Sequence, residues 1–369
     1  MTPGLAERLS KCLECGACVS SCPAGADVPA VIAAMRATMA RDSGQGLSEL
    51  AVRRLIGSQA PAARRLIGLG AAVYRKLPGS RFLPWYELQT RRALPTPGRG
   101  QLESLIPEIS PVSGARIRVA LFPGCTTSLY FQETARAAVR VLNRAGAEVV
   151  LPRRLSCCGA PYRSLGDVEK ADAMRERNLR SLNLTRVDAI VTACSTCTVA
   201  LKHTEVNAAS TIDGASNASP ETRRARTAPV MDIHELLAEI GIPATPSGSP
   251  PPVRVAWHDP CHLRRAPGAT LQPREVIAGL AEVEFVESGE PSCCGGAGVF
   301  SLLHYGLSLK IGLARAEKLA ATGAGIIATG CPGCRIQLDD MMARLGAPVR
   351  IVHAIDLLEG EVHASARGA

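Results

Sequence analysis

Four cysteines near the N-terminus have a spacing that suits metal binding. They follow the pattern Cys-x2-Cys-x2-Cys-x3-Cys-Pro, a spacing that holds 4Fe-4S clusters. The two-residue gaps allow one tight loop to present several thiolates to one cluster, and the small residues Gly16 and Ala17 leave room for inorganic sulfide. Structural zinc instead uses two separated cysteine pairs. We therefore expect an iron-sulfur cluster here, and its candidate ligands are Cys12, Cys15, Cys18 and Cys22.

Ten further cysteines form two sets of five with almost the same internal spacing. The second set repeats the first at offsets of 136 or 137 residues, which indicates an internal duplication. A tetrahedral zinc ion takes four ligands and would leave one thiol over in each set, whereas a larger iron-sulfur cluster can use five. Zinc in both repeats stays open as the alternative. The candidate ligands are Cys125, Cys157, Cys158, Cys194 and Cys197 in the first set and Cys261, Cys293, Cys294, Cys331 and Cys334 in the second.

Composition restricts the other functions that the chain can have. Its 369 residues include neither an apolar run long enough to cross a bilayer nor a secretory signal, so we expect a cytoplasmic protein with reduced thiols. Five Phe, two Trp and five Tyr leave little aromatic surface for stacking on nucleic-acid bases. Phosphate-binding glycine motifs and serine-nucleophile motifs do not occur, so we expect neither a catalytic residue nor a nucleotide-binding residue in this chain.

The cysteines of each repeat follow segments with the pattern of buried strands. Apolar runs alternate with helical patterns, which predicts α/β domains with parallel strands. Cys125 and Cys194, like their counterparts in the second repeat, come shortly after a strand, at the sheet edge where such domains bind ligands. The expected strands are 117–122, 149–151, 189–191, 253–257, 283–286 and 326–328, and the clearest helical patterns are 134–145 and 167–184.

Changes of composition divide the chain into four parts. In the first part, Asp27 is the expected N-cap of a helix with an apolar stripe at Val28, Val31, Ile32, Met35 and Met39. The expected parts are a small helical half-ferredoxin-like module at 1–45, a basic helical linker at 46–111, and two duplicated cysteine-rich α/β domains at 112–242 and 253–369.

The linker carries the charge of the chain. Residues 51–100 hold ten Arg and Lys and one acid, Glu87, so this window alone accounts for the net charge of +9. The sequence Arg-Arg-Leu-Ile-Gly begins at Arg53 and again at Arg64, a period that returns to nearly the same helical face. A solvated linker and a docking surface for an acidic partner or anionic lipid are equally open interpretations.

Two histidines flank Cys261, the first cysteine of the second set. His258 and His262 could tune a cluster by hydrogen bonding to sulfur, or they could cap the ends of the neighbouring strand and helix. The other histidines at 203, 234, 304 and 353 have no recognisable spacing.

The cysteine motifs resemble those of a known family. They are similar to the duplicated cysteine-rich "CCG" domains of the glycolate oxidase iron-sulfur subunit, of lactate-utilisation proteins, of the third subunit of anaerobic glycerol-3-phosphate dehydrogenase and of heterodisulfide reductase. The resemblance covers nearly the whole chain. The motifs that carry it are CCGAP at 157–161, ACSTC at 193–197, HDPCH at 258–262, CCGGAG at 293–298 and GCPGCR at 330–335.

The resemblance implies an iron-sulfur electron-transfer subunit of a flavin-dependent hydroxy-acid dehydrogenase complex. Such a subunit passes electrons from an FAD-containing partner towards a quinone or another carrier, through a 4Fe-4S cluster at the N-terminal motif and iron-sulfur clusters in the CCG domains. In the heterodisulfide reductase branch, complete five-cysteine sets hold noncubane 4Fe-4S clusters, so the alternative is a subunit that reduces a disulfide. A second ferredoxin-like subunit and peripheral contact with the cytoplasmic face of the inner membrane are further expected partners, and nucleic acid is not.

One departure from the family concerns the N-terminal motif. Relatives of this build commonly carry two such runs, and this chain has one. In two-cluster modules the fourth cysteine of a run ligates the other cluster. A cluster on Cys12, Cys15 and Cys18 therefore takes its fourth ligand from Cys22, from a partner subunit or from a small molecule. Pro23 directs Cys22 away from the loop, which favours the partner.

Overall fold

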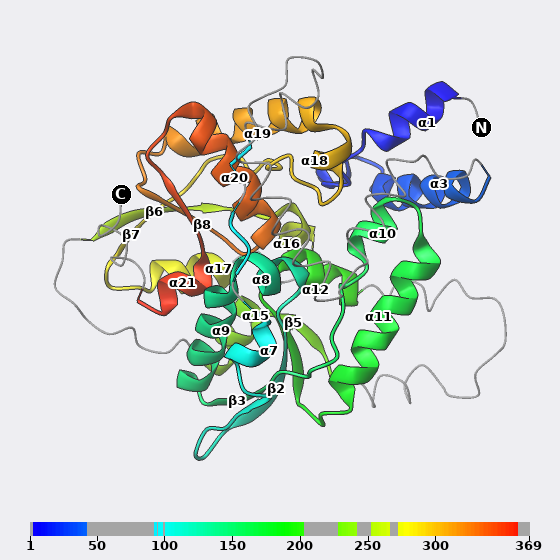
Figure 1. The fold of residues 1–369 in the computed structure, drawn as a ribbon. Coiled ribbons are helices and arrows are strands. Elements are labelled where there is room, and N and C mark those ends of the chain that lie inside the picture. Colours follow the sequence, from blue (N-terminus) through cyan, green and yellow to red (C-terminus); the bar gives the residue numbers. More distant parts are fainter. Residues whose placement is uncertain are drawn as a thin grey trace.

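The computed structural model describes seven stretches of the chain, which form one assembly of two α/β domains and a helical N-terminal module (Figure 1). The basic repeats that begin at Arg53 and Arg64, and most of the expected linker at 46–111, lie outside these stretches. The described residues are 3–42, 92–93, 95–98, 100–202, 228–241, 252–265 and 272–360.

The first domain is built on a five-stranded sheet with the order β1-β3-β2-β4-β5. Four strands run parallel, and β1 pairs with β3 in the antiparallel sense. All four residues of β4 are buried, as expected for a central strand covered on both faces. The strands are β1 Ile109–Ser110, β2 Ile117–Phe122, β3 Ala147–Val150, β4 Ala189–Thr192 and β5 Val230–Asp232, so the sheet begins within the segment expected to be linker.

The second domain repeats this sheet without the antiparallel edge strand. Its order is β7-β6-β8-β9, which matches β3-β2-β4-β5, and all its pairs are parallel. The predicted duplicated α/β fold with parallel strands is therefore confirmed. The strands are β6 Val253–His258, β7 Val283–Val286, β8 Ile326–Thr329 and β9 Arg350–His353.

Helices connect the strands and cover both sheets. The helical patterns at 134–145 and 167–184 correspond to α9 and α11, and the Asp167 side chain caps α11 by accepting the backbone N–H of Lys170. Among the described helices, none is both long and apolar enough to span a bilayer. The first domain contains α7 Leu102–Leu105, α8 Cys125–Tyr130, α9 Gln132–Arg144, α10 Ala160–Ser164, α11 Val168–Asn183, α12 Ser195–Lys202 and α15 Ile233–Ile240. The second contains α16 Cys261–Arg265, α17 Gln272–Ala278, α18 Phe300–Leu303, α19 Tyr305–Ala320, α20 Pro332–Leu345 and α21 Ala354–Leu358.

The two domains pack against each other through equivalent elements. Helix α9 of the first domain contacts α21 of the second, and α17, the counterpart of α9 in the second domain, contacts α15 of the first. In the same way α12 of the first domain contacts α16 of the second, and its counterpart α20 contacts α8 of the first. This reciprocity is the signature of a pseudo-twofold relation between the domains. One hydrophobic core runs through the interface, with Val191 and Leu236 from the first domain and Trp257 and Ile355 from the second.

The N-terminal module consists of α1 Pro3–Ser10, α2 Ala17–Ser20 and α3 Val28–Asp42, and it lies against α10 of the first domain (Figure 1). Asp27 accepts the backbone N–H of Ala30, so it forms the expected N-terminal cap of α3. The expected apolar stripe is wrong at Val31, which is 57% exposed. Helix α3 instead buries Arg36, because its guanidinium finds carbonyl partners at Leu9 and in the cysteine loop.

Candidate metal centres

The strand order places the cysteines of each repeat at a natural ligand-binding edge. In the first sheet β2 and β4 are neighbours although β3 separates them in the chain, so a crevice opens at their carboxyl ends. Cys125 begins α8 after β2, and Cys194 lies between β4 and α12. Cys261 and Cys331 occupy the same places in the second sheet. The predicted location at the carboxyl edge is thus the observed one.

Within each set the sulfur atoms gather at short distances from one another. The Sγ atoms of Cys125 and Cys157 are 3.9 Å apart, and those of Cys294 and Cys334 are 3.4 Å apart. A disulfide needs about 2.05 Å, and all fourteen cysteines are free. Nine of the ten thiols in the two sets are buried, and Cys125 is half-buried. The sets are therefore compact, enclosed groups of unpaired thiols.

The two sets meet each other across the domain interface. The thiols of Cys194 and Cys331, which are equivalent cysteines of the two repeats, are close enough that each shifts the pKa of the other. The Oγ1 atom of Thr196 lies 3.7 Å from the Sγ atom of Cys331, and the backbone N–H of Ser195 donates to the carbonyl of Gly330 over 3.1 Å. Equivalent residues can touch in this way only near the pseudo-twofold axis, so the axis passes between the two sets.

The crowded thiols favour thiolates at particular positions. Hydrogen bonds from the thiols of Cys157 and Cys197 hold the pKa of Cys158 well below its usual value. The thiols of Cys293 and Cys334 lower the pKa of the equivalent Cys294 to about 5. The thiolate is the form of cysteine that ligates metals. Each set thus contains at least one sulfur that is ready to bind a cation.

The donor set fits an iron-sulfur cluster. All ten donors are sulfur atoms, which select soft metals such as zinc and iron in clusters. Five thiols in each set exceed the four ligands of a structural zinc ion. Burying several thiolates without a cation would also be costly. These residues therefore suit a group that takes five sulfur ligands and neutralises their charge.

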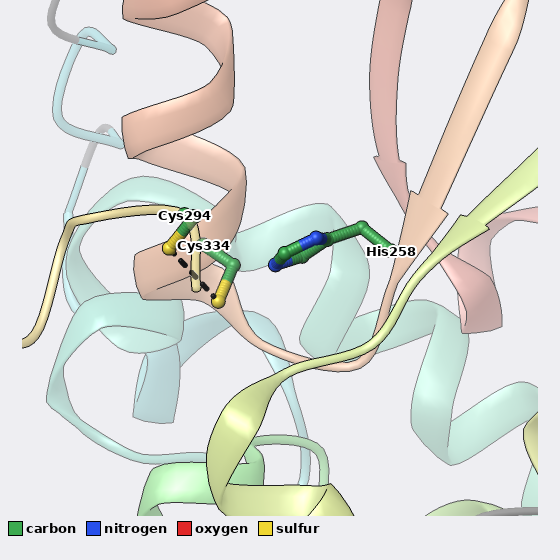
Figure 2. Close-up of side chains that lie close together, drawn as sticks. All are labelled: His258, Cys294 and Cys334. Carbon is green, nitrogen blue, oxygen red and sulfur yellow. Dashed lines mark hydrogen bonds between the residues drawn. The ribbon is translucent and has the colours of Figure 1, made fainter. Parts of the chain in front are cut away.

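The two histidines beside Cys261 have different surroundings. His258 is the last residue of β6, and its ring lies beside Cys294 and Cys334, with one ring nitrogen and the two sulfurs within 4.8 Å of one another (Figure 2). Burial and the neighbouring Arg315 lower the pKa of His258 to about 3, so its ring is neutral. His262 lies beside Cys261, where it lowers the pKa of that thiol, and its Nδ1 lies 3.3 Å from the Oγ1 atom of Thr196 in the first domain.

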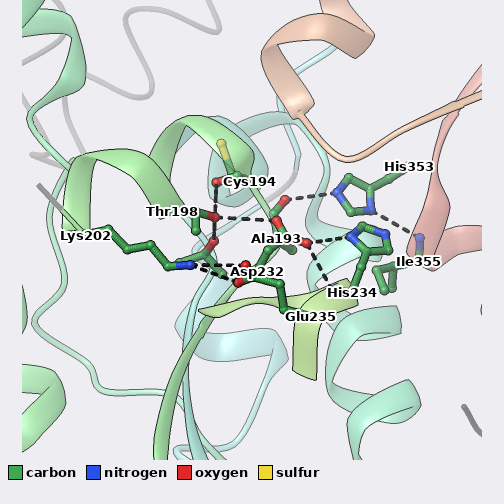
Figure 3. A network of polar contacts seen from close by, with 10 residues as sticks. Ala193, Cys194, Thr198, Lys202, Asp232, His234, Glu235, His353 and Ile355 are labelled. Atoms are coloured by element: carbon green, nitrogen blue, oxygen red, sulfur yellow. Dashed lines mark hydrogen bonds and ion pairs between the residues drawn. The ribbon is translucent and has the colours of Figure 1, made fainter. Parts of the chain in front are cut away.

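A polar network behind Cys194 joins the domains, and no spacing along the chain reveals it. His353 Nε2 donates to the carbonyl of Ala193 over 3.0 Å, and His353 Nδ1 accepts the backbone N–H of Ile355 at the start of α21 (Figure 3). The ring of His234 stacks on that of His353 at 6.1 Å. Thr198 donates to the carbonyl of Cys194. The backbone around Cys194 is therefore fixed by side chains from both domains.

The N-terminal cysteine loop faces the region where the two repeat domains meet. Cys18 is exposed, whereas Cys12, Cys15 and Cys22 are half-buried. Beside the contact with α10, a cavity of about 1060 Å³ lies between this module and the two domains, and its lining includes Cys12, Arg163, Thr196, His262, Arg264 and Phe300. Backbone N–H groups of Ala26 and Ala24 lower the pKa of Cys22. The loop thus lies across a cavity from both repeat domains.

Arg36 fixes the N-terminal loop to the rest of the molecule. Its guanidinium donates to the carbonyls of Leu9 and Cys12 at 2.7 Å each, to the carboxylate of Glu14, and to the carbonyl of Ser164 in the first domain. Sequence reasoning missed this residue because an arginine within an amphipathic helix normally points to solvent. Its position on the otherwise apolar side of the helix was the available signal.

Comparisons with known proteins agree with this geometry. The cysteine-rich CCG domain family matches residues 119–202 and 255–339. An uncharacterised iron-sulfur protein of Methanococcus maripaludis is 27% identical over 361 residues, which are 96% of this chain and 62% of that protein. One of the subunits of the fumarate reductase (CoM/CoB) of Methanothermobacter marburgensis is 27% identical over 362 residues, 96% of this chain and 62% of that protein.

A probable glycolate oxidase iron-sulfur subunit of Bacillus subtilis is 27% identical over 369 residues, which cover 95% of this chain and 81% of that protein. This chain thus spans less than two thirds of the two archaeal relatives and most of the bacterial one. The matched regions contain both five-cysteine sets, and they include β3 and β4 of the first sheet and β7 and β8 of the second. Residues 119–202 and 255–339 therefore match the cysteine-rich CCG domain in two copies, and the chain is similar to proteins named as iron-sulfur proteins.

Proposed function

We propose that this chain is an iron-sulfur electron-transfer subunit of a flavin-dependent hydroxy-acid dehydrogenase of the glycolate or lactate type. The observation that carries the proposal is that the two five-cysteine sets adjoin across the domain interface, where the Oγ1 atom of Thr196, between Cys194 and Cys197, lies 3.7 Å from the Sγ atom of Cys331. An electron relay needs redox centres in close succession within a protected interior, and adjoining buried ligand sets provide such a path. The relative named as a glycolate oxidase iron-sulfur subunit supports this choice of reaction.

The metal groups are proposed to be three iron-sulfur clusters, which accept and release single electrons when bound. The first five-cysteine set and the second would each hold one, of the noncubane or another type, and the N-terminal loop would hold a 4Fe-4S cluster. Cys12, Cys15 and Cys18 are its proposed ligands, with Cys22 or a partner cysteine as the fourth. The surrounding residues exclude water from the two CCG sets, and the exposed Cys18 marks the side on which a partner can approach.

The partner in this proposal is an FAD-containing dehydrogenase subunit. It would oxidise the hydroxy acid, and this chain would pass the electrons towards a quinone or another carrier. A second ferredoxin-like subunit would supply the missing cysteine run, and the basic residues 51–100 would contact an acidic partner or the cytoplasmic face of the inner membrane.

Metal analysis provides the first test of this function. The full chain, purified anaerobically, should contain iron and acid-labile sulfide at about twelve atoms each, four per cluster. Stoichiometric zinc with little sulfide would refute the proposal. Iron and sulfide sufficient for one cluster would show that the CCG domains are structural.

A reconstitution assay distinguishes electron transfer from disulfide reduction, the reaction of the alternative subunit. The chain alone should oxidise neither glycolate nor lactate, and dye reduction with these substrates should begin when the co-purified flavoprotein is added back. Turnover of a small-molecule disulfide by the reduced chain alone, lost on Cys157→Ser or Cys293→Ser, would instead establish the alternative.

A further inference from the structure

The duplication allows the two CCG sites to be compared position by position. Strands β2 and β6 have the same register, since Phe122 pairs with Thr192 in the first sheet and His258 pairs with Thr329 in the second. The strand that leads to the first cysteine therefore ends on phenylalanine in one domain and on histidine in the other. Both side chains are fully buried. The two sites thus differ at one interior position beside the sulfur ligands.

The ring of His258 faces the ligands of the second site. One ring nitrogen and the sulfurs of Cys294 and Cys334 lie within 4.8 Å of one another, and Figure 2 shows the edge of the ring directed at the two sulfurs. Phe122, by contrast, presents only carbon and hydrogen at the equivalent place in the first domain. A hydrogen-bond donor to sulfur is therefore available from this position in the second site alone.

Arg315 determines which ring nitrogen of His258 carries the proton. The Nε atom of Arg315 donates to Nδ1 of His258 over 3.2 Å. A guanidinium only donates, so Nδ1 must accept, and the proton of the neutral ring is on Nε2. Within the described part of the chain, Nε2 is buried without a hydrogen-bond partner. A buried N–H without a partner is rare in folded proteins, and the sulfurs are the acceptors towards which the ring points.

The charge behind the ring differs between the domains as well. Arg315 on α19 is 1% exposed, and it also donates to the carbonyls of Ser288 and Glu290, which are neutral acceptors. The equivalent position on α11 is Asn178, which binds the backbone of Ser156 and Cys157 and carries no charge. The second site therefore has a histidine donor and a buried cation where the first has a phenyl ring and an amide.

We infer that His258, oriented by Arg315, makes the iron-sulfur cluster of the second CCG domain easier to reduce than that of the first, so that electrons collect on the second. This inference rests on the proposed function, because it requires a cluster in each domain. Hydrogen bonds to ligand sulfurs and nearby positive charge stabilise the more negative, reduced state of a cluster and raise its reduction potential. His258 is a positioning and tuning residue in this scheme, and an electron shared between the two clusters resides mainly on the second.

Redox titration of the full chain, followed by EPR, tests the inference. The two CCG clusters should show separate midpoint potentials, and His258→Phe, which copies the first site, should lower the higher one. The expected change is about tenfold in the equilibrium constant for electron sharing, or about 59 mV for a one-electron couple. His258→Gln keeps an N–H donor and should retain most of the difference. The lower midpoint serves as the internal control and should not move.

The outcomes separate this inference from the proposed function. Equal midpoints in the wild type, or midpoints that His258→Phe leaves unchanged at full iron and sulfide content, would overturn the inference and leave the electron-transfer function intact. A wild type without iron and sulfide would refute both.

If His258→Phe loses the second cluster, the inference is tested on the wild-type protein instead. There, hyperfine spectra in deuterated water should show an exchangeable deuteron coupled to the higher-potential signal. Its absence would overturn the inference.

Discussion

At the scale of single residues, the arginine that holds the N-terminal loop is as important as the cysteines. Arg36 is 8% exposed and donates to the carbonyl of Cys12, the first cysteine of the motif, and to that of Leu9, three residues before it. Since these carbonyls face inward, another side chain at this position would leave them without partners. The shape of the N-terminal cysteine loop therefore depends on a residue outside the motif.

Replacement of this arginine should release the N-terminal cluster while sparing the others. In Arg36→Met each orphaned buried carbonyl costs about 1–3 kcal/mol, which loosens the loop. We expect iron to fall by about four atoms per chain, with the EPR signals of the CCG clusters retained. Arg41→Met is the matched control, because Arg41 lies exposed on the same helix and, within the described residues, its side chain donates to the carbonyl of Ala37 alone. Equal iron content in the two variants would contradict this role.

At the scale of elements, the junction between β9 and α21 links the second domain to the first. His353 accepts the N–H of Ile355 at the start of α21 and donates to Ala193, the residue before Cys194. Both bonds require the neutral ring with its proton on Nε2. Protonation of Nδ1 would remove the acceptor that caps α21.

This junction predicts a pH dependence of stability. Burial lowers the pKa of His353 to about 4, whereas an unfolded chain titrates histidine near 6.5. Between these two pKa values the unfolded state binds more protons than the folded state. The contribution of the neutral His353 to the free energy of unfolding is therefore complete above pH 6.5. It is lost as the pH falls towards 4, by up to about 1.4 kcal/mol per pH unit. Anaerobic thermal unfolding at pH 7.5 and 5.5 should show a larger loss for the wild type than for His353→Gln. The same loss in both proteins would show that another group is responsible.

At the scale of the whole molecule, the two CCG domains share one hydrophobic core and the reciprocal contacts of α9 with α21 and of α17 with α15. We therefore expect each domain to depend on the other for its stability. Arg144 of α9 also donates to the carbonyl of Leu358 at the end of α21. The ligand sets meet on the same interface, so its integrity also maintains the metal centres.

A substitution in this interface should therefore destabilise both domains together. Leu358 is fully buried, and Leu358→Ala should cost about 2–5 kcal/mol. Calorimetry should show a single transition that moves to lower temperature, and signals of both CCG clusters should be lost in parallel on heating. Leu184→Ala is the control, because Leu184 is 83% exposed and should be nearly neutral. Two separate transitions would show that the domains unfold independently.

Local information was sufficient for much of this architecture. The strands 117–122 and 283–286 begin and end where their mostly apolar segments predict, because β-branched and aromatic residues favour strands. The duplication also followed from sequence, since the two cysteine sets keep their spacing over 136 or 137 residues. The ligand types and their place after the strands were local properties of the chain.

Only the tertiary structure decided how these parts combine. It brought Cys194 to Cys331, turned His258 rather than His262 towards Cys294 and Cys334, and buried Arg36 against the cysteine loop. These contacts join residues that are 24 to 137 positions apart. Spacing along a chain specifies which residues share a loop or a helix face, but contacts between distant segments depend on how whole domains pack, and no local pattern records that geometry.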